Sequence, residues 1–409
     1  MTARGRFAIG LGIVTYAAAW AFGSKPLYPV AIGLVLSAGL AKLWVALSDR
    51  PMRLTRRIVG GEHVEGDDVE VELCLDRERS LAPGSVRVLE RIGKLGERAT
   101  PLSPSGGSLR AHYVLRSLAR GRYVFEQTKA VIEDPFGLER AELGQHAPGA
   151  LLVYPRLTGL DRLFSEGSGR TRDGRRLLLR RQSGFDLHSV REYEQGESLR
   201  RVHWRATAKR GQLMVKELED APRDEIAVLL DADAATVVGE PPDSSFDLQV
   251  RAAGSILQAH ARRGRRALLV VNSAVTETRR VHSFDGDWRR ALELLASVEP
   301  TGGAPLAALL ADDSRAAARA LELTVVTASL SPLLVDRLVQ RALARRSVAL
   351  VFVDSASFGR GLTGARSQAR RDPALLRLQA AGIAVAVLNR GDDLAAKLGQ
   401  PPVQGIAHG

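Results

Sequence analysis

EIAVLLDAD, at residues 225–233, has five consecutive aliphatic residues followed by Asp231 and Asp233. A run of this kind is typical of a strand buried on both faces of a parallel sheet. Four similar runs follow along the chain: RALLVVNSA (266–274), LTVVTAS (323–329), SVALVFVD (347–354) and IAVAVLNRG (383–391). Helix-like segments alternate with them: 246–263, 288–298, 305–322, 332–346 and 373–382. The alternation predicts a parallel α/β sheet covered by helices on both faces and joined by right-handed crossovers.

The region before residue 158 has a different rhythm, with β-branched residues and a partial alternation of apolar and polar side chains. Four segments show it most clearly: VEVELCL (69–75), SVRVLERI (85–92), LRAHYVLRSL (109–118) and GRYVFEQTKAVIE (121–133). Turn-forming clusters such as SPSGGS (103–108) separate them. Residues 51–158 are therefore predicted to form an antiparallel, β-sandwich-like domain.

Two apolar segments open the chain, FAIGLGIVTYAAAWAF (7–22) and LYPVAIGLVLSAGLAKLWVAL (27–47). Each comes close to the about 20 helical residues that cross a bilayer core of roughly 30 Å. The intervening GSKP is a turn by composition. Together the segments predict a transmembrane helical hairpin. A cleaved signal peptide is the open alternative, because Arg4 and Arg6 precede the first apolar segment and small residues follow it.

The charges that flank the hairpin predict its orientation. Arg4 and Arg6 precede the first apolar segment, and only Lys25 lies in the turn. Four arginines follow the second segment: Arg50, Arg53, Arg56 and Arg57. We therefore expect a multi-pass protein of the inner (plasma) membrane with both termini in the cytoplasm.

Length and composition fit a multidomain globular protein. The chain has 409 residues, 45% of them hydrophobic and 25% charged. Its single cysteine, Cys74, excludes a disulfide framework and a multi-cysteine metal cluster. The absence of a Walker A loop argues against ATP binding by this chain alone. We expect four regions: a membrane hairpin at 1–50, a β-rich domain at 51–158, a basic linker at 159–220 and an α/β domain at 221–409.

The basic linker carries most of the positive charge. Residues 170–216 hold thirteen Arg or Lys and five Asp or Glu, a net +8 of the chain's +12. Such charge fits a solvated surface beside anionic lipid. It also fits nucleic-acid binding, since Phe185, Tyr193 and Trp204 are interleaved with the arginines. That function is not favoured, because no recognised nucleic-acid fold accompanies the charge. The third interpretation is a structural signature that docks a protein partner.

SGFDLHSVREYEQGESLRRVHWRATAKRGQLMVKELE, within the linker, resembles the hallmark of the bacterial proteins called domain of unknown function 58. In that family an R-x-Y-x-x-G-[DE] stretch precedes R-x-[IVH]-x-W and a small-residue, basic turn. The matching residues of the first part are Arg191, Tyr193, Gly196 and Glu197. Those of the second part are Arg201, Trp204, Ala208, Lys209 and Leu213. A stretch with Arg120, Gly121, Tyr123 and DPFGL (134–138) is also similar to the family.

The resemblance covers nearly the whole chain and implies more than the residues alone do. It implies two membrane helices, a β-rich segment and a von Willebrand factor A-like, Rossmann-like domain at the C-terminus. Relatives commonly lie beside MoxR-type AAA+ ATPases and transglutaminase-like membrane proteins. The resemblance therefore implies partner handling, with Arg191, Tyr193, Gly196, Glu197, Arg201, Trp204 and Lys209 as signature or docking residues. We expect Tyr193 and Trp204 to be buried as well, since a large aromatic ring usually is.

A von Willebrand A-like domain can hold a divalent cation at the carboxyl ends of its strands. Its first motif is Asp-x-Ser-x-Ser, and here the chain offers Asp231 and Asp233 but Ala235. Ala304 and Ala328 stand at two further ligand positions. Asp231 and Asp233 are therefore weak candidates for Mg²⁺ or Mn²⁺. Their alternative role is to cap a helix or hold a turn.

These observations favour a membrane-anchored adaptor or scaffold and no enzymatic activity or firmly bound cofactor. The expected partners are the lipid bilayer, a MoxR-type AAA+ ATPase and other membrane proteins, in the assembly or maturation of envelope proteins. The alternative is a membrane-proximal, metal-dependent hydrolase using Asp231 and Asp233, and the second alternative is a nucleic-acid-binding module.

Overall fold

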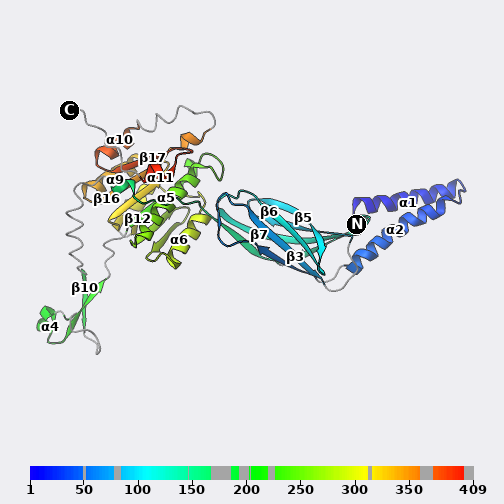
Figure 1. Ribbon diagram of the computed structural model, residues 1–409, viewed down its shortest axis with the longest axis horizontal. Helices are drawn as coiled ribbons and strands as arrows, with labels where there is room; N and C mark the ends of the chain where they lie inside the picture. The colour runs from blue at the N-terminus through cyan, green and yellow to red at the C-terminus, as the bar shows by residue number, and fades with distance from the viewer. Residues whose placement is uncertain are drawn as a thin grey trace. The chain divides into compact units, whose positions relative to one another are not determined.

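The protein is a mixed α/β chain with two apolar helices at its N-terminus and two large sheets (Figure 1). The computed structural model describes residues 1–48, 52–77, 84–145, 147–166, 186–192, 202, 204–219, 226–311, 316–359 and 372–399. The chain forms two compact units, Met1–Pro155 and Arg156–Gly409. The finer division into four domains stays a prediction.

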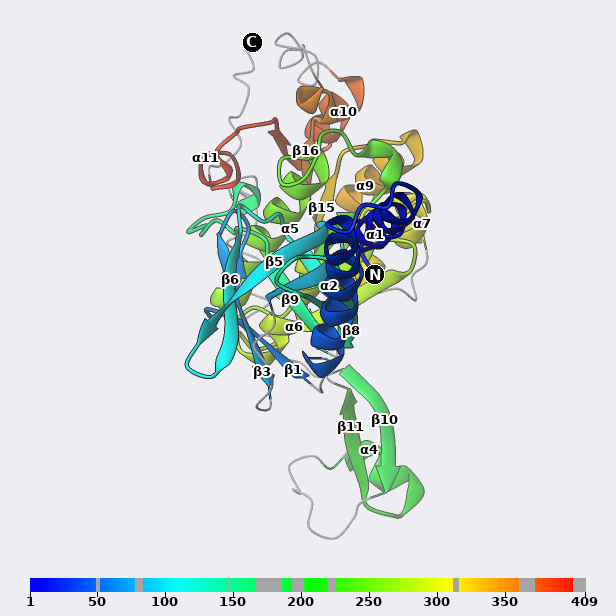
Figure 2. The same cartoon turned by 90° about the vertical axis from the view of Figure 1, so that its right-hand side faces the viewer.

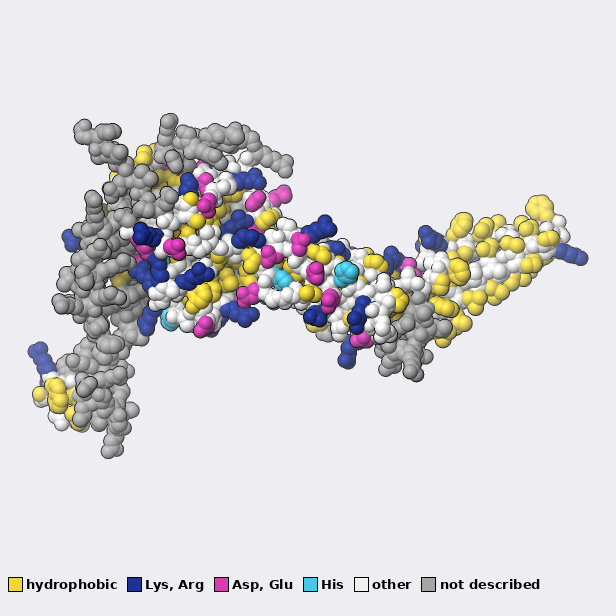
Figure 3. All heavy atoms as spheres, in the orientation of Figure 1, with side chains coloured by type: hydrophobic (Ala, Val, Ile, Leu, Met, Phe, Trp, Pro, Cys, Tyr) yellow, Lys and Arg dark blue, Asp and Glu magenta, His cyan; other side chains and the backbone are white. Residues whose placement is uncertain are grey.

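The two N-terminal helices pack against each other through small residues. They are α1 (Ala3–Ala21) and α2 (Leu27–Ser48). A Cβ added at Gly12 of α1 would lie 2.9 Å from Val35, so only glycine permits this approach. Their outer surfaces are apolar and exposed, as Phe7 at 70% and Trp20 at 78% illustrate (Figure 3). By length and composition, each helix could cross a membrane.

The rest of the first unit is one curled sheet of nine strands. The strands are β1 (Met52–Ile58), β2 (His63–Val64), β3 (Val69–Arg77), β4 (Ser85–Ile92), β5 (Gly96–Ser105), β6 (Ser108–Leu115), β7 (Gly121–Glu133), β8 (Arg140–Gln145) and β9 (Gly149–Tyr154). Their order is β1-β3-β6-β5-β4-β7-β9-β2, with β8 paired to β7. All pairs are antiparallel except the short β2–β9 pair.

Strand β5 joins the two halves of this sheet. Residues Gly96 to Leu102 pair with β4, whereas Ser103 to Ser105 pair with β6. A strand that changes partner in this way bends the sheet over itself. Apolar side chains from both halves accordingly share one core, with Leu73 and Ile132 among its fully buried members. The antiparallel character expected from the sequence is confirmed, and the two expected sheets are one continuous sheet.

A polar network lies inside this core. The Arg56 guanidinium forms an ion pair with Glu90, and the exposed fractions of the two side chains are 5% and 1%. Arg56 Nε donates to Glu90 Oε1 over 2.9 Å, and Tyr113 donates its hydroxyl to Glu90 Oε2 over 2.6 Å. Burial, together with the neighbouring Glu90 carboxylate, raises the pKa of Tyr113, which keeps the phenol protonated as a donor. The sequence placed Arg56 among the flanking charges that predict the orientation of the hairpin. Because its side chain is buried beside Glu90, Arg56 does not contribute to that prediction.

The second unit contains a six-stranded sheet. Its strands are β12 (Ile226–Asp231), β13 (Ala267–Asn272), β14 (Thr276–Val281), β15 (Glu322–Thr327), β16 (Ser347–Val353) and β17 (Ala384–Leu388). The order is β14-β13-β12-β15-β16-β17, and every pair is parallel except β13–β14. The aliphatic runs thus form parallel strands as predicted. The antiparallel edge strand β14 was missed, because its TETRRV sequence is mostly polar.

Helices flank this sheet. They are α5 (Ser245–Arg262), α6 (Gly286–Ser297), α7 (Leu306–Ala311), α8 (Ala316–Arg319), α9 (Pro332–Leu343), α10 (Pro373–Ala380) and α11 (Leu394–Leu398). Two apolar clusters, one with α5, α6 and α11 and one with α7 to α10, take alternate side chains of the same strands. In β12, for example, Val228 belongs to the first cluster and Leu229 to the second. The helices therefore cover both faces of the sheet, as predicted.

Local signals explain where these helices begin. Ser244 caps α5 in a reciprocal capping box with Asp247, and Ser331 caps α9 just before Pro332. The segment that enters this unit packs on α5, where the Thr158 N–H donates to Ser255 Oγ over 2.9 Å. The short helix η1 (Phe164–Glu166) follows it.

A small antiparallel pair lies within the predicted linker. It consists of β10 (Asp186–Glu192) and β11 (Met214–Glu219), with α4 (Trp204–Arg210) between them in sequence (Figure 2). The Met214 N–H donates to Thr207 Oγ1 over 3.0 Å, which ties α4 to the start of β11. Met214 is 1% exposed.

Candidate functional site

Polar side chains gather where the parallel strands of the six-stranded sheet end. Asp231 is the last residue of β12, Asn272 of β13 and Thr327 of β15. These three strands are neighbours, with β12 between the other two. Since the carboxyl ends of parallel strands share one edge of a sheet, the three side chains lie together. Their exposed fractions are 5%, 0% and 0%.

The Asp231 carboxylate links the ends of the three strands. Asn272 Nδ2 donates to Asp231 Oδ1 over 3.3 Å, and Thr327 Oγ1 donates to Asp231 Oδ2 over 2.7 Å. Asn272 Nδ2 also donates to the carbonyl oxygen of Ala304 over 3.0 Å. Thr327 Oγ1 in turn accepts from the Ser329 N–H over 3.0 Å. Both carboxylate oxygens are therefore engaged by the chain itself.

The electrostatic setting of Asp231 is unusual for a carboxylate. Burial raises its pKa above the ordinary 3.8, against the opposing effect of the hydrogen bonds from Thr327 and Asn272. The nearby charge of Asp233 raises it further. In the described part of the chain, Asn272 Oδ1 is a buried oxygen without a hydrogen-bond partner. The site is thus short of positive charge and has one unused acceptor.

Asp233 has a local structural role. Its carboxylate accepts from the Ala235 N–H over 2.9 Å and caps the short helix η3 (Ala234–Thr236). This is the capping alternative that the sequence left open for the two aspartates. The loop that contains Gly302 lies against these strand ends, since the Gly302 N–H donates to the Ala232 carbonyl oxygen over 2.8 Å. A Cβ at Gly302 would come within 2.4 Å of the Asn272 carbonyl oxygen, so this approach requires glycine.

The described residues offer few ligands for a cation at this edge. They are two carboxylates, one amide oxygen and one hydroxyl, from Asp231, Asp233, Asn272 and Thr327. Within the described ranges no group of three or more His, Cys, Asp or Glu is placed to hold a metal ion. Ala304 contributes a carbonyl oxygen, which already accepts from Asn272.

Only some of the signature residues of the linker lie in the described part of the chain. Arg191 lies in β10, where its backbone pairs with Val215. Trp204 and Lys209 lie on α4, at its first turn and its last. The remaining predicted residues lie outside the described part of the chain: Tyr193, Gly196, Glu197 and Arg201.

The expected burial of Trp204 is wrong. Its side chain is 67% exposed, on a seven-residue helix that packs on β11 through Thr207. The expectation rested on the size of the indole alone, and a short helix has only one face to bury. Leu213, in the same segment, is 42% exposed.

Two members of the strand-end cluster were missed in the sequence, Asn272 and Thr327. Both follow an aliphatic run directly, at the position where Asp231 follows its own run. A polar residue that ends a buried parallel strand is the signal that would have found them.

The fold is that of a mixed α/β protein with two apolar N-terminal helices and a polar cluster at the strand ends of its second sheet. Sequence comparison adds a similarity to a protein family. Residues 189–358, from β10 to the end of η4 (Ser355–Phe358), match the family "Protein of unknown function DUF58". Over these residues the chain is similar to that family, as its hallmark indicated. No curated protein matches the chain.

Two solved structures show distant similarity. One is the CARDB domain of the PF1109 protein of Pyrococcus furiosus in complex with di-metal ions, at 14% identity and a TM-score of 0.18. That match covers 25% of this chain and 87% of the other. The second is Cwp6 of Clostridium difficile, at 8% identity and a TM-score of 0.17, covering 73% of this chain and 37% of that one.

Proposed function

We propose that this protein is a membrane-anchored adaptor whose second unit is a von Willebrand A-like domain. Numbered within its own sheet, the strand order is 3-2-1-4-5-6, which is the doubly wound order of Rossmann-like domains. Two apolar helices support the membrane anchor. The family match, residues 189–358, spans the signature segment together with five of the six strands of the second unit's sheet.

The observation that carries the adaptor function is the internal engagement of Asp231. A carboxylate has about four acceptor positions, and each one used inside the fold is lost to a catalytic or cation-binding role. Here both oxygens accept hydrogen bonds from neighbouring strand ends, and Asp233 caps η3. The cluster therefore supports a role in holding the sheet edge, which then serves as a platform for a protein partner.

Exposed residues of α4 supply the docking surface of this proposal. Trp204 is 67% exposed, and Arg205, Lys209 and Arg210 are exposed on the same helix. Tryptophan and arginine are the residue types most often responsible for binding energy at protein interfaces. The family resemblance makes a MoxR-type AAA+ ATPase the partner, and the task is the assembly or maturation of envelope proteins.

The adaptor hypothesis requires cytoplasmic termini, because an AAA+ ATPase needs cytoplasmic ATP. Reporter fusions at residue 60 and at the C-terminus should both be active in the cytoplasm. The arginines around the hairpin set this orientation. Activity of either fusion only outside the membrane would support the signal-peptide alternative and remove the ATPase from reach.

The central experiment is a crosslinking pull-down of the full chain from membranes, with and without ATP. We expect an AAA+ ATPase to be captured, to a degree that depends on nucleotide. Trp204→Ala should reduce its capture at least about tenfold if the indole contributes 1.4 kcal/mol or more to binding. Leu343→Ala is the matched control, because Leu343 is 73% exposed on α9, outside the signature segment. Equal capture by both variants would contradict docking through α4.

A metal-dependent hydrolase is the second candidate function, and the raised pKa of Asp231 is the observation that favours it. Titration of the full chain in detergent with Mg²⁺ or Mn²⁺ distinguishes the two. The adaptor hypothesis predicts weak, salt-sensitive binding, since hard cations prefer about six oxygen ligands. Tight binding that is lost in Asp231→Asn would place the hydrolase ahead.

A further inference from the structure

The turn between β7 and β8, residues 134–138 with the sequence DPFGL, is held by one buried carboxylate. Asp134 is 3% exposed, and its two oxygens accept from the Phe136 N–H over 2.9 Å and the Glu139 N–H over 2.6 Å. Gly137 has a φ of 67°, a conformation that side chains disfavour. The conformation of the turn is therefore held by the Asp134 carboxylate and by the glycine at position 137.

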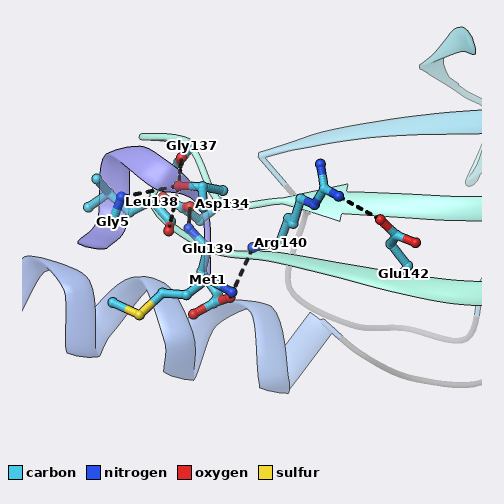
Figure 4. A network of polar contacts seen from close by, with 9 residues as sticks. Met1, Gly5, Asp134, Gly137, Leu138, Glu139, Arg140 and Glu142 are labelled. Carbon is cyan, nitrogen blue, oxygen red and sulfur yellow. Dashed lines mark hydrogen bonds and ion pairs between the residues drawn. The ribbon is translucent and has the colours of Figure 1, made fainter. Parts of the chain in front are cut away.

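The first turn of α1 is fastened to this loop (Figure 4). The Thr2 N–H donates to the Leu138 carbonyl oxygen over 3.1 Å, and Thr2 Oγ1 donates to the Gly137 carbonyl oxygen over 2.8 Å. The Met1 ammonium group forms an ion pair with Glu139. A Cβ added at Gly5 would lie 2.1 Å from the Leu138 carbonyl oxygen, so the contact exists only because residue 5 is glycine.

The length of α1 fixes the depth of the loop in a membrane. Its 19 residues span about 28 Å, against a hydrocarbon core of roughly 30 Å. The helix therefore needs its whole length to cross, and its first turn lies at the level of the lipid headgroups. The exposed side chains of Arg4 and Arg6 in that turn are cations suited to anionic headgroups. The loop fastened to Thr2 lies at the same level.

Phe136 differs from its neighbours in the turn by its exposure to solvent. Its ring is 76% exposed, whereas Asp134 and Glu139 are 3% and 8% exposed. Packing and hydrogen bonding of the turn do not use the ring. Its loop neighbour Gly137 lies close to a cation, since a Cβ at Gly137 would be 3.6 Å from Arg4 Nη1. An exposed aromatic ring beside arginines is typical of a membrane-interface segment.

We propose that the 134–138 turn is a lipid-binding anchor, in which the Phe136 ring inserts among the headgroups while Arg4 and Arg6 bind their phosphates. This proposal rests on the membrane-spanning hairpin of the proposed function and adds a second attachment to it. The anchor fixes the β-rich domain to the bilayer surface. A lipid surface is the occupant because the loop is continuous, through Thr2, with a helix that already lies in the membrane.

The test uses a fluorescent environment-sensitive label (NBD) on single cysteines in a Cys74→Ser background of the full chain. The cysteines are placed by Phe136→Cys, Leu95→Cys and Leu36→Cys. The chain is reconstituted in phosphatidylcholine vesicles with a minor fraction of phosphatidylglycerol. Lipids brominated near the headgroup or deep in the acyl chain quench the label according to its depth.

The other two positions are matched controls. Leu95 is 44% exposed in the turn after β4, and it lies at the opposite end of the strand pair β4–β7 from Phe136. The eight residues of β4 separate the two ends by about 27 Å. Leu36 is 58% exposed near the middle of α2.

We expect the label at 136 to show blue-shifted emission and quenching by the shallow brominated lipid. The label at 95 should behave as in water, and the label at 36 should be quenched by the deep brominated lipid. A water-like label at 136 together with a quenched label at 36 overturns the anchor and leaves the hairpin standing. An unquenched label at 36 overturns the hairpin itself. Shielding of 136 in native membranes but not in pure lipid assigns the surface to a protein and overturns the lipid proposal.

A glycine pair tests the dependence on α1. Gly5→Ala should detach the loop and shift the label at 136 to its water-like emission. Gly10→Ala is the control on the same helix, because a Cβ there meets nothing within 4 Å. A label at 136 that stays quenched in Gly5→Ala would show that α1 does not position the loop, which contradicts the proposed geometry.

Discussion

In each unit of the chain a polar network surrounds a buried carboxylate, Glu90 in the first and Asp231 in the second, and the two networks differ in charge. In the first unit, Glu90 is paired with the Arg56 guanidinium, which also lies 3.8 Å above the Phe125 ring. In the second unit, Asp231 accepts hydrogen bonds from an amide and a hydroxyl, both neutral. The first network balances its charge, and the second relies on neutral donors.

This difference decides how each network responds to change. Removal of Glu90 leaves an arginine buried without its counter-charge, and desolvating a lone charge is among the largest penalties in proteins. Asp231 can lose its charge by binding a proton, and burial already favours that state. The β-rich domain is thus sensitive to mutation of its carboxylate, whereas the strand-end cluster is sensitive to pH.

Glu90→Ala should have the largest effect. We expect a loss of about 3–5 kcal/mol in the free energy of unfolding of the first unit, because the Arg56 charge is stranded and Tyr113 loses its acceptor. Denaturant unfolding of the full chain in detergent, followed by a probe in this unit, measures it.

The control for that prediction is Glu72→Ala. Glu72 Oε2 lies 3.8 Å from Arg57 Nη1, and the exposed fractions of the Glu72 and Arg57 side chains are 53% and 78%. Such a surface pair contributes about 0–1 kcal/mol. Equal losses of unfolding free energy in the two variants would show that the buried ion pair stabilises the unit no more than the surface pair does.

Thr327→Val should have an intermediate effect. It keeps the shape of the side chain and removes the donor to Asp231 Oδ2, and a hydrogen bond to a charged group is worth about 1.5–3 kcal/mol. The loss should appear at neutral pH in the unfolding of the second unit. It should become smaller in acid, where Asp231 is protonated. A loss that does not change with pH would mean that the hydroxyl matters only for packing.

Asp231→Asn should have a small effect at neutral pH and a distinct one in acid. The new amide can accept from Asn272 and donate to Thr327 Oγ1, so both contacts survive. In the wild type, the raised pKa means that the folded state binds the proton more tightly than the unfolded state. Its stability relative to the variant therefore rises as pH falls through the folded-state pKa towards 3.8, and is constant below.

The two proteins must be compared at each pH, because His260 acts in the opposite direction. Burial, with the charges of Arg265 and Arg263, lowers the pKa of His260 from 6.5 to about 3. Its contribution to stability is present above 6.5 and is lost as pH falls towards 3. This loss is common to both proteins and cancels in their difference. A difference that does not change with pH would refute the titration of Asp231.

Trp204→Ala should have the smallest effect on stability. The indole is 67% exposed, and substitutions at exposed positions usually stay within about 0.5 kcal/mol. Thermal unfolding of the variant should therefore match the wild type while partner capture falls. A loss of about 3 kcal/mol would show instead that the ring packs in a core.

Much of the fold was predictable because its signals are local. The sequence predicted strands at 85–92 and 121–133, and β4 and β7 have these bounds. The aliphatic runs of the second unit became parallel strands for the same reason, since burial on both faces leaves a continuous apolar stretch. The change of partner in β5 was not predictable, because SPSGGS has turn composition and the strand extends into it to Ser105.

The candidate site was predictable only in part. Asp231 was found from its place at the end of an apolar run, and capping was foreseen as a role for the aspartates. The hydrogen bonds to Asn272 and Thr327 depend on which strands become neighbours, and residues 41 and 96 positions apart meet only through the sheet order. The exposure of Trp204 depends on the packing of α4, which its sequence does not specify.

Under the proposed membrane anchor, the short α1 also relates this protein to the thickness of a bilayer. A helix longer than the bilayer can tilt to adjust, but one of 19 residues has no excess length. Its first turn is held at the loop of β7 and β8, so in a thick, sterol-like bilayer the lipid must thin around the helix or the fastening must yield. Under that anchor, the contact at Gly5 would transmit hydrophobic mismatch to the β-rich domain, and the resulting strain would be least in thin bilayers.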